Sequence, residues 1–209
     1  MKNIKGFAIT ACILLGVVIF KQITKKSVRE SVVDAALQGK DSSGQSNPSK
    51  SSVDTAITQQ LWFTNTQHGL AFETPKAIKE EQMPIPQGTE EYFSAVYSYS
   101  FKDNDFLLNY SVMDSYFKTY DTKAGLEGAV KNFINTANGS DLKLAFKKVK
   151  DMNCHTCSGE LTFKGVKMTV QGYSLFKEGR IFMLVATGQD GELVRKKINR
   201  VFGSIRTIA

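Results

Sequence analysis

The alternation of apolar and polar residues is clearest towards the end of the chain. The stretch from Val166 to Ala186 reads as two apolar strands joined by a tight turn at residues 177–179. From Ile181 to Ala186 residues of both parities are apolar, which is typical of a strand covered on both faces. We therefore predict that this segment lies centrally in a sheet.

An amphipathic helix should follow these strands. Asp190 stands at the position of a helix N-cap, and Glu192 places a negative charge in the first turn. Apolar residues then recur three or four positions apart, at Val194, Ile198, Val201 and Ile205. This spacing predicts a helix that packs one face across the central strand.

The same patterns organise the middle of the chain into hairpins and one further helix. They predict a hairpin of residues 61–63 and 70–72, a second of residues 92–101 and 106–113, a helix over 122–137, and strands over 142–152 and 159–163. Hairpins outnumber crossover connections, so the expected fold class is α+β: a largely antiparallel sheet with helices packed on it.

Two sequence signatures resemble a known group. The opening N-x-x-x-G-L-A-F-E-x-P, from Asn65 to Pro75, and the ending Y-x-L-F-K-E-G-R-I-F-M-L-V with a terminal helix closing in Phe-Gly-Ser-Ile are similar to the PsbP-like α/β/α sandwiches. The resemblance covers residues 61–206. It implies a non-enzymatic binding or accessory domain and supplies no catalytic signature and no site residues.

The amino terminus has the pattern of an export signal or membrane anchor. A short basic start precedes an uncharged apolar run from Gly6 to Phe20. No small-x-small cleavage site follows, so we expect residues 1–26 to form an uncleaved signal anchor with a single transmembrane helix. Residues 9–12 resemble a lipobox, but most of the apolar run lies after Cys12, which favours an ordinary membrane residue there.

A linker separates this anchor from the globular domain. Residues 27–37 could form a short helix, and residues 38–55 are rich in Gly, Ser, Asn and Lys, a composition typical of a flexible tether. We therefore divide the chain into an anchor (1–26), a helix and linker (27–60) and an α+β domain (61–209). Basic residues after the span favour a cytoplasmic domain, whereas the short amino-terminal tail favours export; we expect a periplasmic or otherwise extracytoplasmic domain on the inner membrane.

Charge does not indicate a nucleic-acid partner. The net charge is +7, yet residues 1–60 hold 8 basic and 4 acidic residues, which leaves 19 and 16 for the remainder. No zinc-finger spacing, RNP-like motif or basic stripe with interleaved aromatics is present. The basic clusters therefore read as solvated faces, and we expect a membrane and a protein as partners.

The sharpest local feature is Cys154-His155-Thr156-Cys157. Thiols at this spacing can form a disulfide, act as a redox pair or supply half of a zinc site. We place the motif in a turn between two strands, which favours a disulfide clip in an oxidising compartment. Redox chemistry and metal handling remain alternatives.

Tyrosines provide the other candidate site. Tyr97, Tyr99 and Tyr110 could line a binding surface on the sheet, because each has an apolar body and a polar tip; cross-strand packing under a helix is the alternative. His68 precedes Gly69 in a predicted turn, where a histidine is usually exposed. Serine-nucleophile, P-loop and H-E-x-x-H motifs are missing from the sequence, and no cofactor is indicated.

These observations favour a membrane-tethered, exported binding or accessory domain of the cell envelope that works without catalysis. The alternative is a thiol-disulfide redox or metal-handling protein that uses Cys154 and Cys157. Whether the chain is an enzyme stays open at this point.

Overall fold

A computed structural model describes residues 61–85, 87–102, 106–137 and 139–208. The anchor predicted from Gly6 to Phe20 and the linker after it lie outside these ranges. Within the part of the chain that is described, no helix has the length and hydropathy needed to cross a membrane.

Strands dominate the described residues. In chain order the elements are β1 (Phe63–Gln67), β2 (Leu70–Thr74), β3 (Lys79–Met83), β4 (Phe93–Lys102), β5 (Phe106–Ser115), α4 (Thr122–Ala137), β6 (Ser140–Lys148), β7 (Cys154–Phe163), β8 (Val166–Lys177), β9 (Arg180–Gln189), α5 (Glu192–Gly203) and β10 (Arg206–Thr207).

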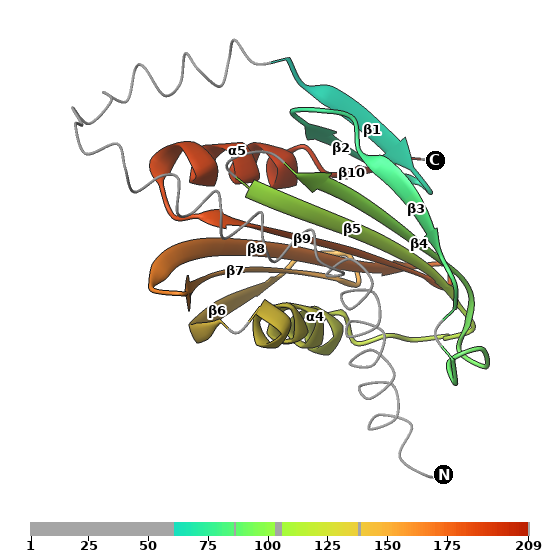
Figure 1. Ribbon diagram of the computed structural model, residues 1–209. Coiled ribbons are helices and arrows are strands. Elements are labelled where there is room, and N and C mark those ends of the chain that lie inside the picture. The colour runs from blue at the N-terminus through green and yellow to red at the C-terminus, as the bar shows by residue number, and fades with distance from the viewer. Residues whose placement is uncertain (1–60, 86, 103–105, 138, 209) are drawn as a thin grey trace, which may run out of the picture.

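A seven-stranded antiparallel sheet forms the centre of the molecule (Figure 1), with strand order β3-β4-β5-β9-β8-β7-β6. Strand β9 is the middle strand, as the apolar run from Ile181 to Ala186 predicts. A smaller antiparallel sheet has the order β1-β2-β10. The α+β class and the largely antiparallel sheet are confirmed.

The two faces of the large sheet are covered differently. Helix α5 and the small sheet lie over one face, and α4 lies over the other, where it contacts β6, β7 and β8 (Figure 1). The strands in the middle therefore bury side chains on both faces, whereas β6 and β3 form the two edges.

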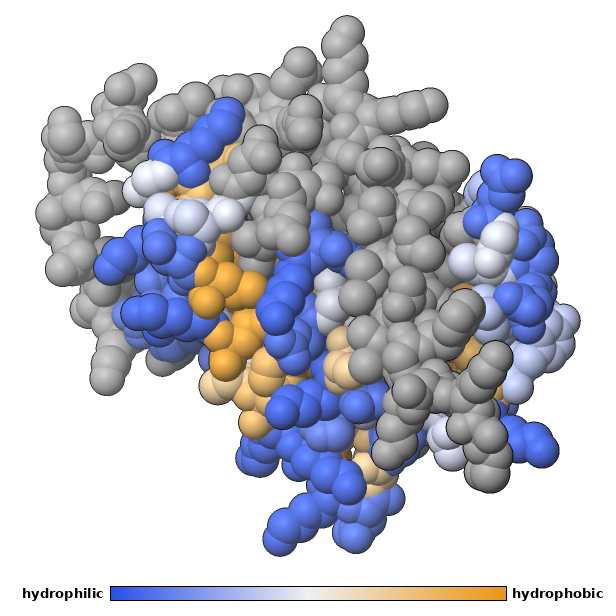
Figure 2. Space-filling view, turned by 90° about the horizontal axis from the view of Figure 1, so that it is seen from below, coloured by the Kyte–Doolittle hydropathy of each residue, from blue (hydrophilic) through white to orange (hydrophobic). Residues whose placement is uncertain are grey.

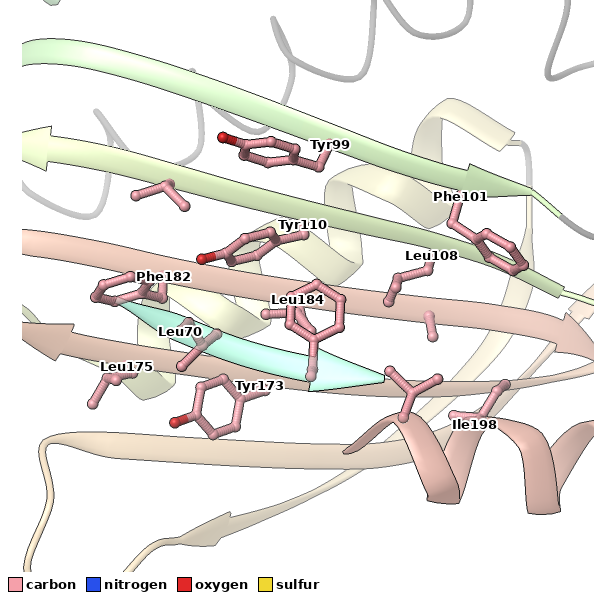
Figure 3. Packing of buried hydrophobic residues seen from close by; sticks show 14 of the residues in the cluster. Leu70, Tyr99, Phe101, Leu108, Tyr110, Tyr173, Leu175, Phe182, Leu184 and Ile198 are labelled. Atoms are coloured by element: carbon pink, nitrogen blue, oxygen red, sulfur yellow. The ribbon is translucent and has the colours of Figure 1, made fainter. Parts of the chain in front are cut away.

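The larger core lies between the sheet and the layer of α5 with β2. Figure 3 shows Leu184 of β9 and Ile198 of α5 in this core, both with no exposed surface. Burying a side chain of this size contributes about 1.5–3 kcal/mol to folding. This packing explains why the sequence repeats an apolar residue at each inward position of the strands and along one stripe of α5.

A second core lies under α4. Leu126 and Val130 from the predicted helix stripe are fully buried there and pack against Leu161 and Val170 of β7 and β8. The helix bounds agree with the predicted range of 122–137.

The prediction for the start of α5 is wrong in its detail. The N-cap is Gly191, whose backbone is extended and which makes no side-chain cap. The Asp190 carboxylate instead accepts hydrogen bonds from Arg195 Nε (2.5 Å) and Nη2 (2.9 Å). A bidentate guanidinium contact satisfies both carboxylate oxygens, and a cap to one backbone N–H does not.

Strand bounds around the cysteine motif also differ from the prediction. The strand expected over 142–152 ends at Lys148, and the next begins at Cys154, so the turn covers residues 149–153. A hydrogen bond from Val149 N to Cys154 O (3.0 Å) closes it. The Cys-x-x-Cys motif therefore lies inside a strand and not in a turn. Strands β3 and β10 were not predicted, because neither carries an alternating apolar pattern.

Candidate functional site

The two cysteines of the C-x-x-C motif lie on opposite faces of the large sheet. Successive side chains in a strand alternate between faces, so residues three apart point in opposite directions. Cys154 belongs to the core under α5 and Cys157 to the core under α4. The sequence spacing that brings two thiols together in a turn or a helix separates them in β7.

Both thiols are free and buried. The predicted disulfide is therefore wrong: the strand places its two halves in different cores. Burial raises the pKa of Cys157 to about 12, and it also raises that of Cys154, against a smaller opposing effect of a hydrogen bond with Tyr173. Protonated thiols on opposite faces suit neither disulfide exchange nor a shared metal.

His155, between the cysteines, takes part in a different contact. Its Nδ1 lies 2.8 Å from the Thr122 hydroxyl at the start of α4, which in turn contacts Asn153. These hydrogen bonds attach the helix to the turn before β7. No group of three or more His, Cys, Asp or Glu side chains that could hold a metal occurs within the described residues.

The tyrosines predicted as a binding surface gather under the small sheet. Tyr99 and Tyr110 are opposite each other on β4 and β5, and their rings are stacked with centroids 5.4 Å apart (Figure 3). They are 1% and 0% exposed. Of the three tyrosines, only Tyr97 is near enough to solvent to contribute to a surface.

Hydrogen bonds link these rings to the β1–β2 turn. The Tyr110 hydroxyl donates to the Gln67 carbonyl oxygen (3.1 Å), and the Tyr99 hydroxyl lies 2.6 Å from His68 Nε2. The His68 ring also contacts the Tyr97 ring in a tilted arrangement, with centroids 4.1 Å apart and an interplanar angle of 35°. His68 is thus an anchor between the two sheets and is half-buried, whereas the sequence suggested an exposed turn residue.

The surroundings of His68 and Tyr99 favour the neutral forms of both side chains around pH 7. Burial and the charge of Arg180 lower the pKa of His68. Burial, with Glu80 nearby, raises the pKa of Tyr99 to about 12. Arg180 in addition donates to the His68 carbonyl oxygen (3.1 Å) and to Asp114 (2.5 Å). These hydrogen bonds attach the β1–β2 turn to the large sheet through Tyr99, Tyr110 and Arg180.

On the face of the sheet shared with α5, strands β6, β7 and β8 carry a shallow groove of about 300 Å³ between the sheet and the end of the helix. Its lining combines the two phenylalanines Phe146 and Phe202 with small and polar residues, chiefly Ala145, Lys147, Thr156, Ser158 and Gln171. Hydroxyl, amide and ammonium groups beside an aromatic ring can bind a polar segment of a partner.

The groove borders the edge strand β6, whose residues alternate between exposed and half-buried. On the face turned towards α4, Leu142, Leu144 and Phe146 pack against the helix core and stay partly exposed. Figure 2, which looks onto the α4 side, shows a strip of apolar side chains flanked by hydrophilic ones. Sequence reasoning missed this site, since it requires three strands and a helix end to meet; the alternation in β6 was its only local signal.

Comparisons of the sequence with known proteins found no relative. No protein-family model matches the sequence, and no curated protein matches it either.

Among solved structures, the chain is similar to the cyanobacterial PsbP (CyanoP) of Synechocystis, at 11% identity and a TM-score of 0.46, over 70% of this chain and 91% of that one. It is also similar to LpqN of Mycobacterium tuberculosis, at 11% identity and a TM-score of 0.40, over 79% and 100%. The PsbP-like resemblance of the sequence is thus matched at the level of the fold. At these values the likeness concerns the arrangement of elements and carries no function to this chain.

Proposed function

We propose that the chain is a membrane-tethered, exported domain of the cell envelope that binds a partner protein without catalysing a reaction. The observation that carries this proposal is the edge strand β6, whose outer side pairs with no strand among the described residues, with a shallow groove on one face and partly exposed apolar side chains on the other. The uncharged run from Gly6 to Phe20 and the Gly/Ser-rich linker support a tether.

The alternative thiol or metal function has little support from the geometry. A disulfide requires Cβ atoms about 3.5–4.5 Å apart, which side chains on opposite faces of one strand cannot reach. Burial also leaves Cys154 and Cys157 protonated at neutral pH, whereas a redox cysteine reacts as the thiolate.

Membrane orientation can be tested with one exposed cysteine. Ser158 is exposed in β7, so Ser158→Cys in a Cys12→Ser background should react with a membrane-impermeant maleimide in intact spheroplasts. Labelling that requires lysis would place the domain in the cytoplasm and contradict export.

Partner binding can be tested by photo-crosslinking in cells. A photoreactive residue is placed at Ala145, beside the groove, and in separate variants at exposed positions on other parts of the surface, such as Lys118 and Lys164. A discrete protein adduct at one or more positions is the expected result. Absence of any adduct across the scanned surface would contradict a binding function.

A further inference from the structure

Strand β6 is one of the two edge strands of the large sheet among the described residues. It pairs with β7 on one side, and no described strand pairs with its other side. Its outward N–H and C=O groups are therefore a template for one more strand. The register shift between Ser140 and Lys143, with Asp141 at φ 55°, interrupts regular pairing at the start of the strand. Regular pairing continues from Lys143 to Lys148.

The two faces of this edge differ in chemistry. Lys143, Ala145 and Lys147 are exposed on the face with the groove, and the intervening Leu144 and Phe146 are half-buried on the face with α4. A strand added here would place alternate side chains beside the two lysines and the others beside the two apolar residues, because directly opposite residues share a face.

We propose that β6 receives, as an eighth strand of the large sheet, an extended segment of a partner protein in which acidic and apolar residues alternate. The inference rests on the proposed binding function and names its surface. Carboxylates of the segment meet Lys143 and Lys147, with the Thr156 and Ser158 hydroxyls further into the groove. Apolar side chains of the segment cover the exposed parts of Leu144 and Phe146.

Charge selects against a second copy of this chain as the occupant. If two β6 edges paired with each other, the lysines of one would lie close to those of the other, and like charges in neighbouring strands are destabilising. Edge lysines are a common protection against such pairing. The same lysines attract a segment of opposite charge, so the edge discriminates between partners.

The test uses the full-length protein in nanodiscs and fluorescent peptides of about eight residues, which span ~26 Å as a strand. One peptide alternates Glu and Val. A second has the same composition with all Glu in one half, and a third alternates Lys and Val. Anisotropy titrations should show binding of the first peptide alone, weakening as salt is added.

Charge reversal on the protein provides the matched comparison. Lys143→Glu with Lys147→Glu should weaken binding of the Glu/Val peptide roughly tenfold and allow the Lys/Val peptide to bind. Lys118→Glu with Lys177→Glu changes the net charge equally at exposed sites away from β6, in the loop after β5 and at the end of β8, and should leave the affinity unchanged. If both double variants lost the same affinity for the Glu/Val peptide, net charge alone would explain the loss, and the proposal would be overturned.

Backbone pairing is tested on the wild-type protein with N-methylated peptides, so this arm does not depend on a variant that folds. Methylation of alternate amides removes the N–H groups along one edge of the peptide. One of the two alternate sets should abolish binding and the other should not. Tolerance of both sets, or no binding of the Glu/Val peptide, would overturn strand addition. A crosslinked adduct away from Ala145 would then leave the binding function standing with a different surface.

Discussion

The placement of Cys154 and Cys157 in β7 makes a strong prediction about thiol reactivity. In a Cys12→Ser background these are the two cysteines of the chain. Both should be reduced in the folded protein, even after isolation from an oxidising compartment, because they lie in separate cores. Labelling with an aromatic disulfide reagent under native conditions should therefore be very slow.

The magnitude follows from the burial of Cys157. Its pKa is raised from 9.0 to about 12, which lowers the thiolate fraction near neutral pH about a thousandfold. Direct attack by the thiolate should slow by up to this factor, because a thiolate of higher pKa is also the stronger nucleophile. Burial further blocks access of the reagent. The observed rate should then follow opening of the domain and rise steeply with denaturant.

Ser158→Cys supplies a control in the same strand. This residue is exposed, so the new thiol should be labelled at the rate of an ordinary cysteine while the two native thiols are not. Rapid labelling of Cys154 and Cys157 in the native protein would refute their burial. An intact mass lower by two hydrogens would show a disulfide and refute their placement on opposite faces.

Three further predictions concern stability. Because the pKa of Cys157 is higher in the folded than in the unfolded state, its thiol contributes fully to the free energy of unfolding below pH 9, and this contribution is lost as the pH rises towards 12. The wild-type protein should therefore lose about 1.4 kcal/mol more of its free energy of unfolding between pH 7 and 10 than Cys157→Ala does, as measured by urea titrations. Gly172→Ala places a Cβ 2.7 Å from Leu126 Cδ1 and should lower the free energy of unfolding by about 1–3 kcal/mol. The loss should be smaller in a Leu126→Ala background, so additive losses in a double-mutant cycle would contradict this contact. Asn65→Ala removes a buried amide that bonds Thr74 Oγ1 (2.7 Å) and the Ile78 N–H (3.0 Å), and should destabilise the domain by about 1–3 kcal/mol by thermal melting, whereas an unchanged melting temperature would show that these bonds add nothing.

The fold class was readable from local patterns. The apolar parity of Ile181 to Ala186 correctly indicated the middle strand of the sheet, and the stripe of Leu126 and Val130 correctly indicated a packed helix. Periodicity reports which side of an element is buried, and hairpin spacing reports which strands are neighbours. Both are properties of short stretches.

The candidate sites were less readable, because each depends on residues far apart in the chain. The tyrosines were identified as a group, but their burial follows from the small sheet, whose His68 reaches Tyr99 from another hairpin. The groove needs β6, β7, β8 and the end of α5 together.

The sequence alone determined the order of elements, the buried faces of the strands and helices, and the anchor-like and linker-like composition of the first sixty residues. Only the tertiary structure decided the role of the cysteines. A spacing of three residues brings thiols together in a turn and separates them in a strand, and ten paired residues with β8 held Cys154 to Phe163 in the strand. Pairing between distant segments therefore set the chemistry of that motif, through the direction in which its side chains point.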